Sequence, residues 1–215
     1  MLLLIDNVVS NPDPAEYMSV LELMTKGGIV MIPILLFSMI SVYVFIEKLI
    51  YVIKNSKVEK SLSQKLINEL SGGKTEQALL ICRNNNSTGR VFENGISKMG
   101  KPIQEIEDMM ETASNIEIAR MEQRTGYLGI IAGIAPMLGF IGTISGVIKI
   151  FYNISLSDNI SIGLIADGLY QKMICSATGL IVGVVAYAFY HYLQMQIDKF
   201  TSRLQENVLI FIKSL

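Results

Sequence analysis

Hydroxyl side chains lie inside two long apolar stretches of this chain, and both stretches are rich in glycine. The first stretch carries Thr143, and the second carries Ser176 and Thr178. A polar side chain within lipid is costly unless it faces a packed interior or a polar path, so these hydroxyls are candidates for a proton or ion pathway. The alternative is that each hydroxyl bonds to a carbonyl of its own helix, as Ser and Thr often do.

Small residues recur at helical spacing around these hydroxyls. They are Gly126, Gly129, Gly133, Pro136, Gly139, Gly142 and Gly146 in the first stretch, and Ser176, Gly179, Gly183 and Ala186 in the second. Small faces let membrane helices approach each other closely. We expect a helix-packing or pore-facing surface here, although packing alone explains any single glycine equally well. Pro136 predicts a kink.

Depth counting predicts that the hydroxyls lie at one level. Measured from the stretch ends that face the short loop between them, Thr143 lies about 7.5 Å deep, Ser176 about 6 Å and Thr178 about 9 Å, at 1.5 Å per residue. A polar path would need such a shared level.

Acidic side chains are absent from the interior of these two apolar stretches. No Asp, Glu or His lies well inside them, and Asp167 and Lys172 stand only at the edge of the second. We interpret these two as interface contacts. A proton relay normally needs an ionisable group in the membrane. If the chain moves protons, a partner helix must supply the carboxylate.

Three uncharged runs are long enough to cross a bilayer, which takes about 20 residues. They are Gly27 to Ile46, Thr125 to Ile148, and Met173 to Tyr190, the last of which can extend toward Ile197. The chain is 51% hydrophobic with a mean hydropathy of +0.44. These features predict an all-α integral membrane protein with three transmembrane helices, two of them extended far into the cytoplasm, and a helical cytoplasmic loop.

Several classes of function are disfavoured by composition. The net charge of −1 lacks the basic excess of a nucleic-acid-binding protein. Cys82 and Cys175 have no metal-ligand company, and we expect no disulfide, metal or cofactor. The sequence shows no nucleophile–base pair or phosphate-binding loop, so we expect no enzyme. The first residues, MLLLID, lack a basic region, and no cleavable signal peptide is expected.

The distribution of Lys and Arg predicts the orientation. The segment from Glu47 to Arg124 holds 12 of the 18 basic residues, whereas the N-terminal segment holds only Lys26. By the positive-inside rule the large loop and the C-terminus are cytoplasmic. The N-terminus and the short second loop are then periplasmic.

These observations divide the chain into seven segments. They are an N-terminal periplasmic segment (1–26), a first transmembrane helix (27–53), a cytoplasmic helical region (54–124), a second transmembrane helix (125–148), a short periplasmic loop with the start of the third helix (149–172), a third transmembrane helix (173–197) and a cytoplasmic C-terminal helix (198–215).

The sequence of the cytoplasmic region predicts three short helices and one long helix. Gly72-Gly73 and the run Asn84 to Asn86 act as stops between short helices, and Pro102 opens the long helix. No strong breaker follows before Ile148, so a continuous helix from Ile103 to Ile148 is expected. The third span likewise runs on without Gly or Pro to about Lys213.

At these motifs the chain resembles the MotA/TolQ/ExbB proton channel family, specifically its ExbB/TolQ branch. The resemblance rests on IAPMLGFIGTISGVI in the second span, GLYQKMICSATGLIVG at the third, KGGIVMIP before the first, and the pair Glu47-Lys48 at its end. It covers nearly the whole chain. Three spans rather than four separate the chain from the flagellar stator branch.

The resemblance implies a homopentamer in the bacterial inner membrane. It would enclose transmembrane helices of an ExbD/TolR-like partner whose Asp takes up protons, and it would deliver work to a TonB- or TolA-like protein for outer-membrane transport. Thr143 matches one polar position of the family, and Ser176 stands where the family has a second Thr. The family's acidic residue near the inner end of span two matches either Glu117 or Glu122, and both are candidates for partner or interface contacts. A family Pro later in span three is Val185 here.

Two questions stay open at the level of sequence. A passive membrane scaffold, whose glycine faces only assemble helices, is the alternative to a proton-driven subunit. Within the leading hypothesis, ExbB-type and TolQ-type systems are not separated.

Overall fold

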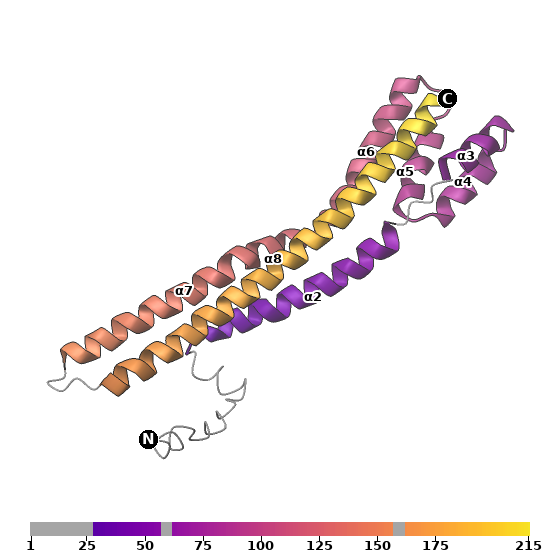
Figure 1. Ribbon diagram of the computed structural model, residues 1–215. Helices are drawn as coiled ribbons and strands as arrows, with labels where there is room; N and C mark the ends of the chain where they lie inside the picture. The colour runs from indigo at the N-terminus through magenta and orange to yellow at the C-terminus, as the bar shows by residue number, and fades with distance from the viewer. Residues whose placement is uncertain (1–27, 57–61, 157–161) are drawn as a thin grey trace, which may run out of the picture. The chain divides into compact units, whose positions relative to one another are not determined.

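The computed structural model describes residues 28–56, 62–156 and 162–215, and these residues are almost entirely helical (Figure 1). The helices are α2 (Met31–Asn55), α3 (Leu62–Ser71), α4 (Thr75–Asn84), α5 (Ser87–Ile96), α6 (Ile103–Glu122), α7 (Thr125–Ser155) and α8 (Ile162–Lys213). The predicted all-α fold is confirmed. The predicted N-terminal segment 1–26 lies outside the described residues.

Three helices are long and apolar enough to cross a membrane. They correspond to Met31–Asn55, Thr125–Ser155 and Gly168–Lys213. Large apolar side chains on these helices are exposed, among them Met137 at 65% and Phe140 at 62%. Such exposure suits contact with lipid or with other helices rather than with water. The prediction of three helices that are long and apolar enough to span a membrane is confirmed, and α8 continues to Lys213 as expected.

The described residues form two compact units. The first contains the chain up to Leu35 together with Met137–Leu180. The second contains Leu36–Pro136 together with Ile181–Leu215. In the first unit α7 and α8 run antiparallel, because Gly139 faces Ser176 while Gly168 faces Ile150.

The second unit holds the main hydrophobic core, which α6 and the last turns of α8 share with the short helices α3 to α5. Phe92 of α5 meets Phe211 of α8 edge to face, with ring centroids 5.3 Å apart. The core also buries Leu62, Leu66, Ala78, Cys82, Val91, Ile96, Ile106, Met110, Met121, Ile197, Phe200 and Leu204. Within this unit α6 and the C-terminal part of α8 lie side by side (Figure 1).

The ends of the short helices follow local sequence signals. Gly73 adopts φ 72°, a conformation that favours glycine, where α3 ends. Asn85 is extended after α4, and Pro102 is the residue immediately before α6. Gly89 of α5 is also required by space, because a Cβ there would overlap the carbonyl of Cys82.

The expectation of one continuous helix from Ile103 to Ile148 is wrong. α6 ends at Glu122, Gln123 is extended with ψ 129°, and Arg124 adopts φ 71° before α7 begins. The Thr125 hydroxyl donates to the Glu122 carbonyl at 2.7 Å, and Arg124 pairs with Glu47 at 2.8 Å. Tertiary contacts therefore override a local sequence that favours helix. Pro136 lies inside α7, and its predicted kink stays a prediction.

Candidate functional site

Glycine lets α7 and α8 meet at backbone distance in the first unit. A Cβ built on Gly139 would lie 3.1 Å from the Ser176 Cα and from the Cys175 carbonyl oxygen. A Cβ on Gly142 would lie 2.8 Å from the Cys175 sulfur. At Gly146 the obstacle would be the flexible side chain of Lys172. The close approach expected from the small-residue stripe is present at these positions.

The other positions of the stripe have mixed surroundings. In the second unit Gly183 packs against Pro136, and a Cβ on Gly129 would touch the Tyr190 ring at 3.7 Å. Gly179 is buried. Nothing lies within 4 Å of a Cβ on Gly126 or Gly133. The stripe therefore contains positions that the chain itself covers and positions that it leaves uncovered.

This contrast predicts different responses to the same small substitution. Gly139→Ala should destabilise the α7–α8 contact by about 1–3 kcal/mol, because the obstructing atoms are backbone. Gly133→Ala should cost nothing and can gain about 0.5–1 kcal/mol from helix propensity. Far-UV circular dichroism melting of the purified chain in detergent measures both. Equal melting temperatures for the two variants would contradict the contact at Gly139.

Two of the three candidate pathway hydroxyls donate hydrogen bonds to backbone carbonyl groups. Thr143 Oγ1 lies 3.1 Å from the carbonyl oxygen of Gly139 and 3.2 Å from that of Lys172, and it donates its single hydrogen between them. Thr178 Oγ1 donates to Ile174 at 2.8 Å. The bonds of Thr143 to Gly139 and of Thr178 to Ile174 stay within one helix, which is the alternative to a role in a pathway. Ser176 is half-buried, and its hydroxyl forms no hydrogen bond with the described part of the chain.

The expected common level of the hydroxyls is off by about one helical turn. Thr143 lies opposite Lys172, whereas Ser176 lies opposite Gly139. Four residues separate these levels on either helix, which is about 6 Å at 1.5 Å per residue. Counting from the ends of apolar runs failed because α7 extends to Ser155 and α8 begins at Ile162, beyond both runs.

Residues at the edge of the third span have a mixed outcome. Lys172 lies within α8, with its aliphatic chain against Gly146 and its Nζ 3.4 Å from a Cβ built on Gly28. The side chain of Asp167 lies outside the described residues. Their assignment as interface contacts stays a prediction.

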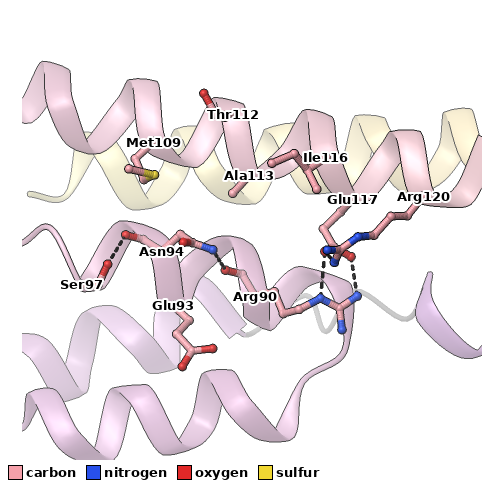
Figure 2. A pocket seen from close by; sticks show the side chains of 10 residues that line it. All are labelled: Arg90, Glu93, Asn94, Ser97, Met109, Thr112, Ala113, Ile116, Glu117 and Arg120. Carbon is pink, nitrogen blue, oxygen red and sulfur yellow. Dashed lines mark hydrogen bonds and ion pairs between the residues drawn. The ribbon is translucent and has the colours of Figure 1, made fainter.

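A charged cluster joins α5 and α6 in the second unit (Figure 2). The Glu117 side chain is 4% exposed and accepts a hydrogen bond from Arg90 Nε at 2.9 Å. Arg90 Nη2 binds its second carboxylate oxygen, and Arg120 Nη1 lies 2.6 Å from the first. The sequence analysis missed Arg90, because a partner 27 residues away leaves no local signal.

The electrostatics of this cluster favour ionised Glu117. Burial alone would raise its pKa, but hydrogen bonds from Arg90 and Ser87 and the charges of Arg90 and Arg120 outweigh burial, so its pKa is lowered. The Glu117 hydrogen bond also raises the pKa of Arg90. The cluster is therefore an ion-paired brace between α5 and α6 at neutral pH.

A lowered pKa makes the stability of this bundle dependent on pH. The contribution of Glu117 is complete above its ordinary pKa of 4.5 and is lost as the pH falls through the lower folded-state value. Hydrogen exchange of α5 amides should thus be constant from pH 7 to 5, after correction for intrinsic rates, and should rise below that window. Glu117→Gln should remove this Glu117-dependent rise, and Glu107→Gln, on the exposed face of α6, should keep it. An unchanged curve for Glu117→Gln would refute the brace.

An open groove of about 490 Å³ lies beside the cluster. Its lining combines the cluster with Glu93, Asn94, Ser97, Met109, Thr112, Ala113 and Ile116 (Figure 2). Among the described residues no group of three or more His, Cys, Asp or Glu side chains is placed to hold a metal ion. Glu122 differs from Glu117 in being exposed, with Gln194 Nε2 3.4 Å from its carboxylate.

Comparison with known proteins agrees with this architecture. The family model described as "MotA/TolQ/ExbB proton channel family" matches residues 83–206. That range covers more than half of the chain, including the α7–α8 contact and the charged cluster. The chain belongs to the MotA/TolQ/ExbB proton channel family. It is thus a multi-pass membrane protein of a channel family, and the expectation that it is not an enzyme agrees with this membership.

Individual relatives support the ExbB-like resemblance over most of the chain. An ExbB homolog of Methanothermobacter thermautotrophicus is 30% identical over 185 residues, which cover 84% of this chain and 64% of that protein. Biopolymer transport protein exbB1 of Vibrio cholerae is 25% identical over 88% of this chain and 86% of its own. The Tol-Pal system protein TolQ of Haemophilus influenzae is 28% identical over 41% of this chain and 39% of its own. The chain spans just under two thirds of the first of these relatives.

Proposed function

We propose that this chain is the channel-forming subunit of a proton-driven energy-transduction complex of the ExbB/TolQ type. With an ExbD/TolR-like partner it converts proton motive force into mechanical work on a TonB- or TolA-like protein. Membrane potential supplies about 2.3 kcal/mol per charge per 100 mV. The relatives named for biopolymer transport and for the Tol-Pal system support this reading.

The single observation that carries the proposal is a hydroxyl-bearing helix pair without acid. Thr125–Ser155 and Gly168–Ile197 contain no Asp or Glu, yet Thr143 and Ser176 lie at a close contact of α7 with α8. A proton-conducting path needs a titrating group. The uncovered face at Gly126 and Gly133 suits close approach of further helices, from other copies or from a partner that carries an Asp.

The proposed assembly is a homopentamer in the bacterial cytoplasmic membrane. The N-terminus and the segment 149–172, which includes the end of α7 and the start of α8, face the periplasm, while 54–124 and 198–215 face the cytoplasm, in keeping with the positive-inside count. In this arrangement Thr143, Ser176 and Thr178 line the proton path. The glycines of the stripe face neighbouring helices. Glu122, Asp167 and Lys172 contact partners, whereas Glu117 serves within its own chain.

A passive helix scaffold is the second candidate function, and one observation favours it. The hydroxyls of Thr143 and Thr178 bond to carbonyls, so their presence alone does not require a pathway. A scaffold would tolerate loss of these hydroxyls, which separates it from the channel subunit.

Native mass measurement of the complex extracted from its own membrane tests the assembly. We expect several copies of the 23.8 kDa chain together with a smaller membrane protein that has an Asp in its transmembrane helix. The free chain alone, without any such companion, would contradict the proposal.

A further inference from the structure

We propose that Glu47 and Lys48 of α2 latch the helix break at Gln123–Arg124, and that this break is a hinge between α6 and the first turns of α7. The proposed hinge involves residues of the second unit only. Its consequence for energy transduction rests on the proposed function.

The break is imposed rather than encoded locally. Arg124 adopts φ 71°, a left-handed conformation that is strained for a residue other than glycine. Neither Gly nor Pro occurs between Ile103 and Thr125. Met121, Glu122, Gln123 and Arg124 are all good helix formers. Contacts from outside this segment must therefore fix its non-helical conformation.

Two consecutive residues of α2 hold the two sides of the break. Lys48 Nζ donates to the Arg120 carbonyl in the last turn of α6 at 3.3 Å. Glu47 Oε1 accepts from Arg124 Nη1 at 2.8 Å. One α2 turn thus contacts the end of α6 and the strained residue before α7, and we call Glu47, Lys48 and Arg124 the latch.

Keeping the latch formed costs free energy, which distinguishes it from a contact that only stabilises the fold. Lys48 is 5% exposed, and its ammonium has one carbonyl bond and the Tyr51 ring, whose centroid is 5.0 Å away. Glu47 Oε2 is buried and accepts no hydrogen bond from the described residues. The buried charge of Lys48, the unpaired Oε2 of the partly exposed Glu47 and a strained backbone are offset only by surrounding contacts. The junction is therefore poised to open when those contacts loosen.

Hydrogen exchange of the full chain in lipid nanodiscs tests the hinge without any assay of function. Without the latch the junction is no longer fixed in one conformation, so its amides should lose their hydrogen bonds more often. Glu47→Gln and Lys48→Met should each raise exchange of the amides from Met121 to Tyr127 by about tenfold or more, while α3 to α5 keep their protection. Lys48→Arg should retain most of the protection, because it keeps the charge and the donor. Glu47→Gln combined with Arg124→Gln should add little to either change alone, since both break one ion pair.

The control is another partly exposed ion pair, which lies at the opposite end of α6 from the latch. Lys101 and Glu105 pair at 3.1 Å at the start of α6, and Lys101→Gln should leave the junction unchanged. Arg124→Gln gives a second test, because it removes the ion pair and keeps the backbone strain. Exchange at the junction should rise in this variant as it does in Glu47→Gln.

The outcomes are decisive in each direction. Unchanged exchange from Met121 to Tyr127 in Glu47→Gln would overturn the latch, and so would increased exchange spread evenly over α3 to α6. If Lys48→Met unfolds the bundle, Glu47→Gln still decides, because Glu47 is partly exposed and tolerates an amide. In the assembled complex, an opened hinge should lower partner-dependent transport severalfold with proton conduction retained. Absence of proton conduction in the unaltered complex would contradict the proposed function, but it would not affect the hydrogen-exchange result.

Discussion

Transport driven by the complex should fall at least about tenfold when Thr143→Val and Ser176→Ala are combined, which corresponds to about 1.4 kcal/mol in the limiting barrier. Val is nearly isosteric with Thr, so the contact of α7 with α8 at Gly139 should persist. The lost hydrogen bonds of Thr143 cost little in a membrane, about 0.6 kcal/mol each. Assembly should thus survive while transport is lost.

The measurement is partner-dependent transport in cells, alongside the amount of assembled complex. Ser145→Ala is the matched control, because Ser145 lies two residues from Thr143 but is exposed and bonds to the Gly142 carbonyl at 3.1 Å. It should leave transport unchanged. Thr178→Val tests the third hydroxyl separately. Normal transport by the double variant would favour the passive scaffold.

Arg90→Met should lower the free energy of unfolding of the helical bundle by about 2–3 kcal/mol. The change removes two of the three guanidinium hydrogen bonds to a carboxylate that is only 4% exposed. Arg120 remains, but it extends from the same helix one turn away. The partly exposed guanidinium groups keep this cost below that of a fully buried pair.

A second substitution makes the Arg90 prediction sharper. Arg90→Met with Glu117→Leu should be more stable than Arg90→Met alone, because no carboxylate is left buried without its partner. Hydrogen exchange of α5 and α6 amides measures both. Arg83→Met is the control, since the Arg83–Glu93 pair at 3.1 Å is exposed and should contribute under about 1 kcal/mol. Equal losses for Arg83→Met and Arg90→Met would contradict the role assigned to the cluster.

Periodic and compositional features were predictable from the sequence. Long uncharged runs give the three spanning helices, and the absence of Gly and Pro after Gly183 gives the continuation of α8 to Lys213. Small residues at helical spacing gave the close approach at Gly139. These features depend on local pattern and on the thickness of a bilayer, so a single sequence carries them.

Features that depend on long-range partners were not predictable. The break at Arg124 is held by Glu47, which lies 77 residues earlier, and Glu117 is neutralised by Arg90. The register of Thr143 against Lys172 depends on where the helices actually end. No spacing rule reports contacts of this kind, because they arise only when separate helices pack.

Proton conduction by reconstituted liposomes tests the central claim most directly. The purified chain alone should conduct no more protons than empty liposomes under an imposed membrane potential, because its α7 and α8 spans offer hydroxyls without a carboxylate. Conduction should appear when the co-purified partner is reconstituted with it, and should vanish when the transmembrane Asp of that partner is changed to Asn. Strong proton conduction by the chain alone would contradict the account.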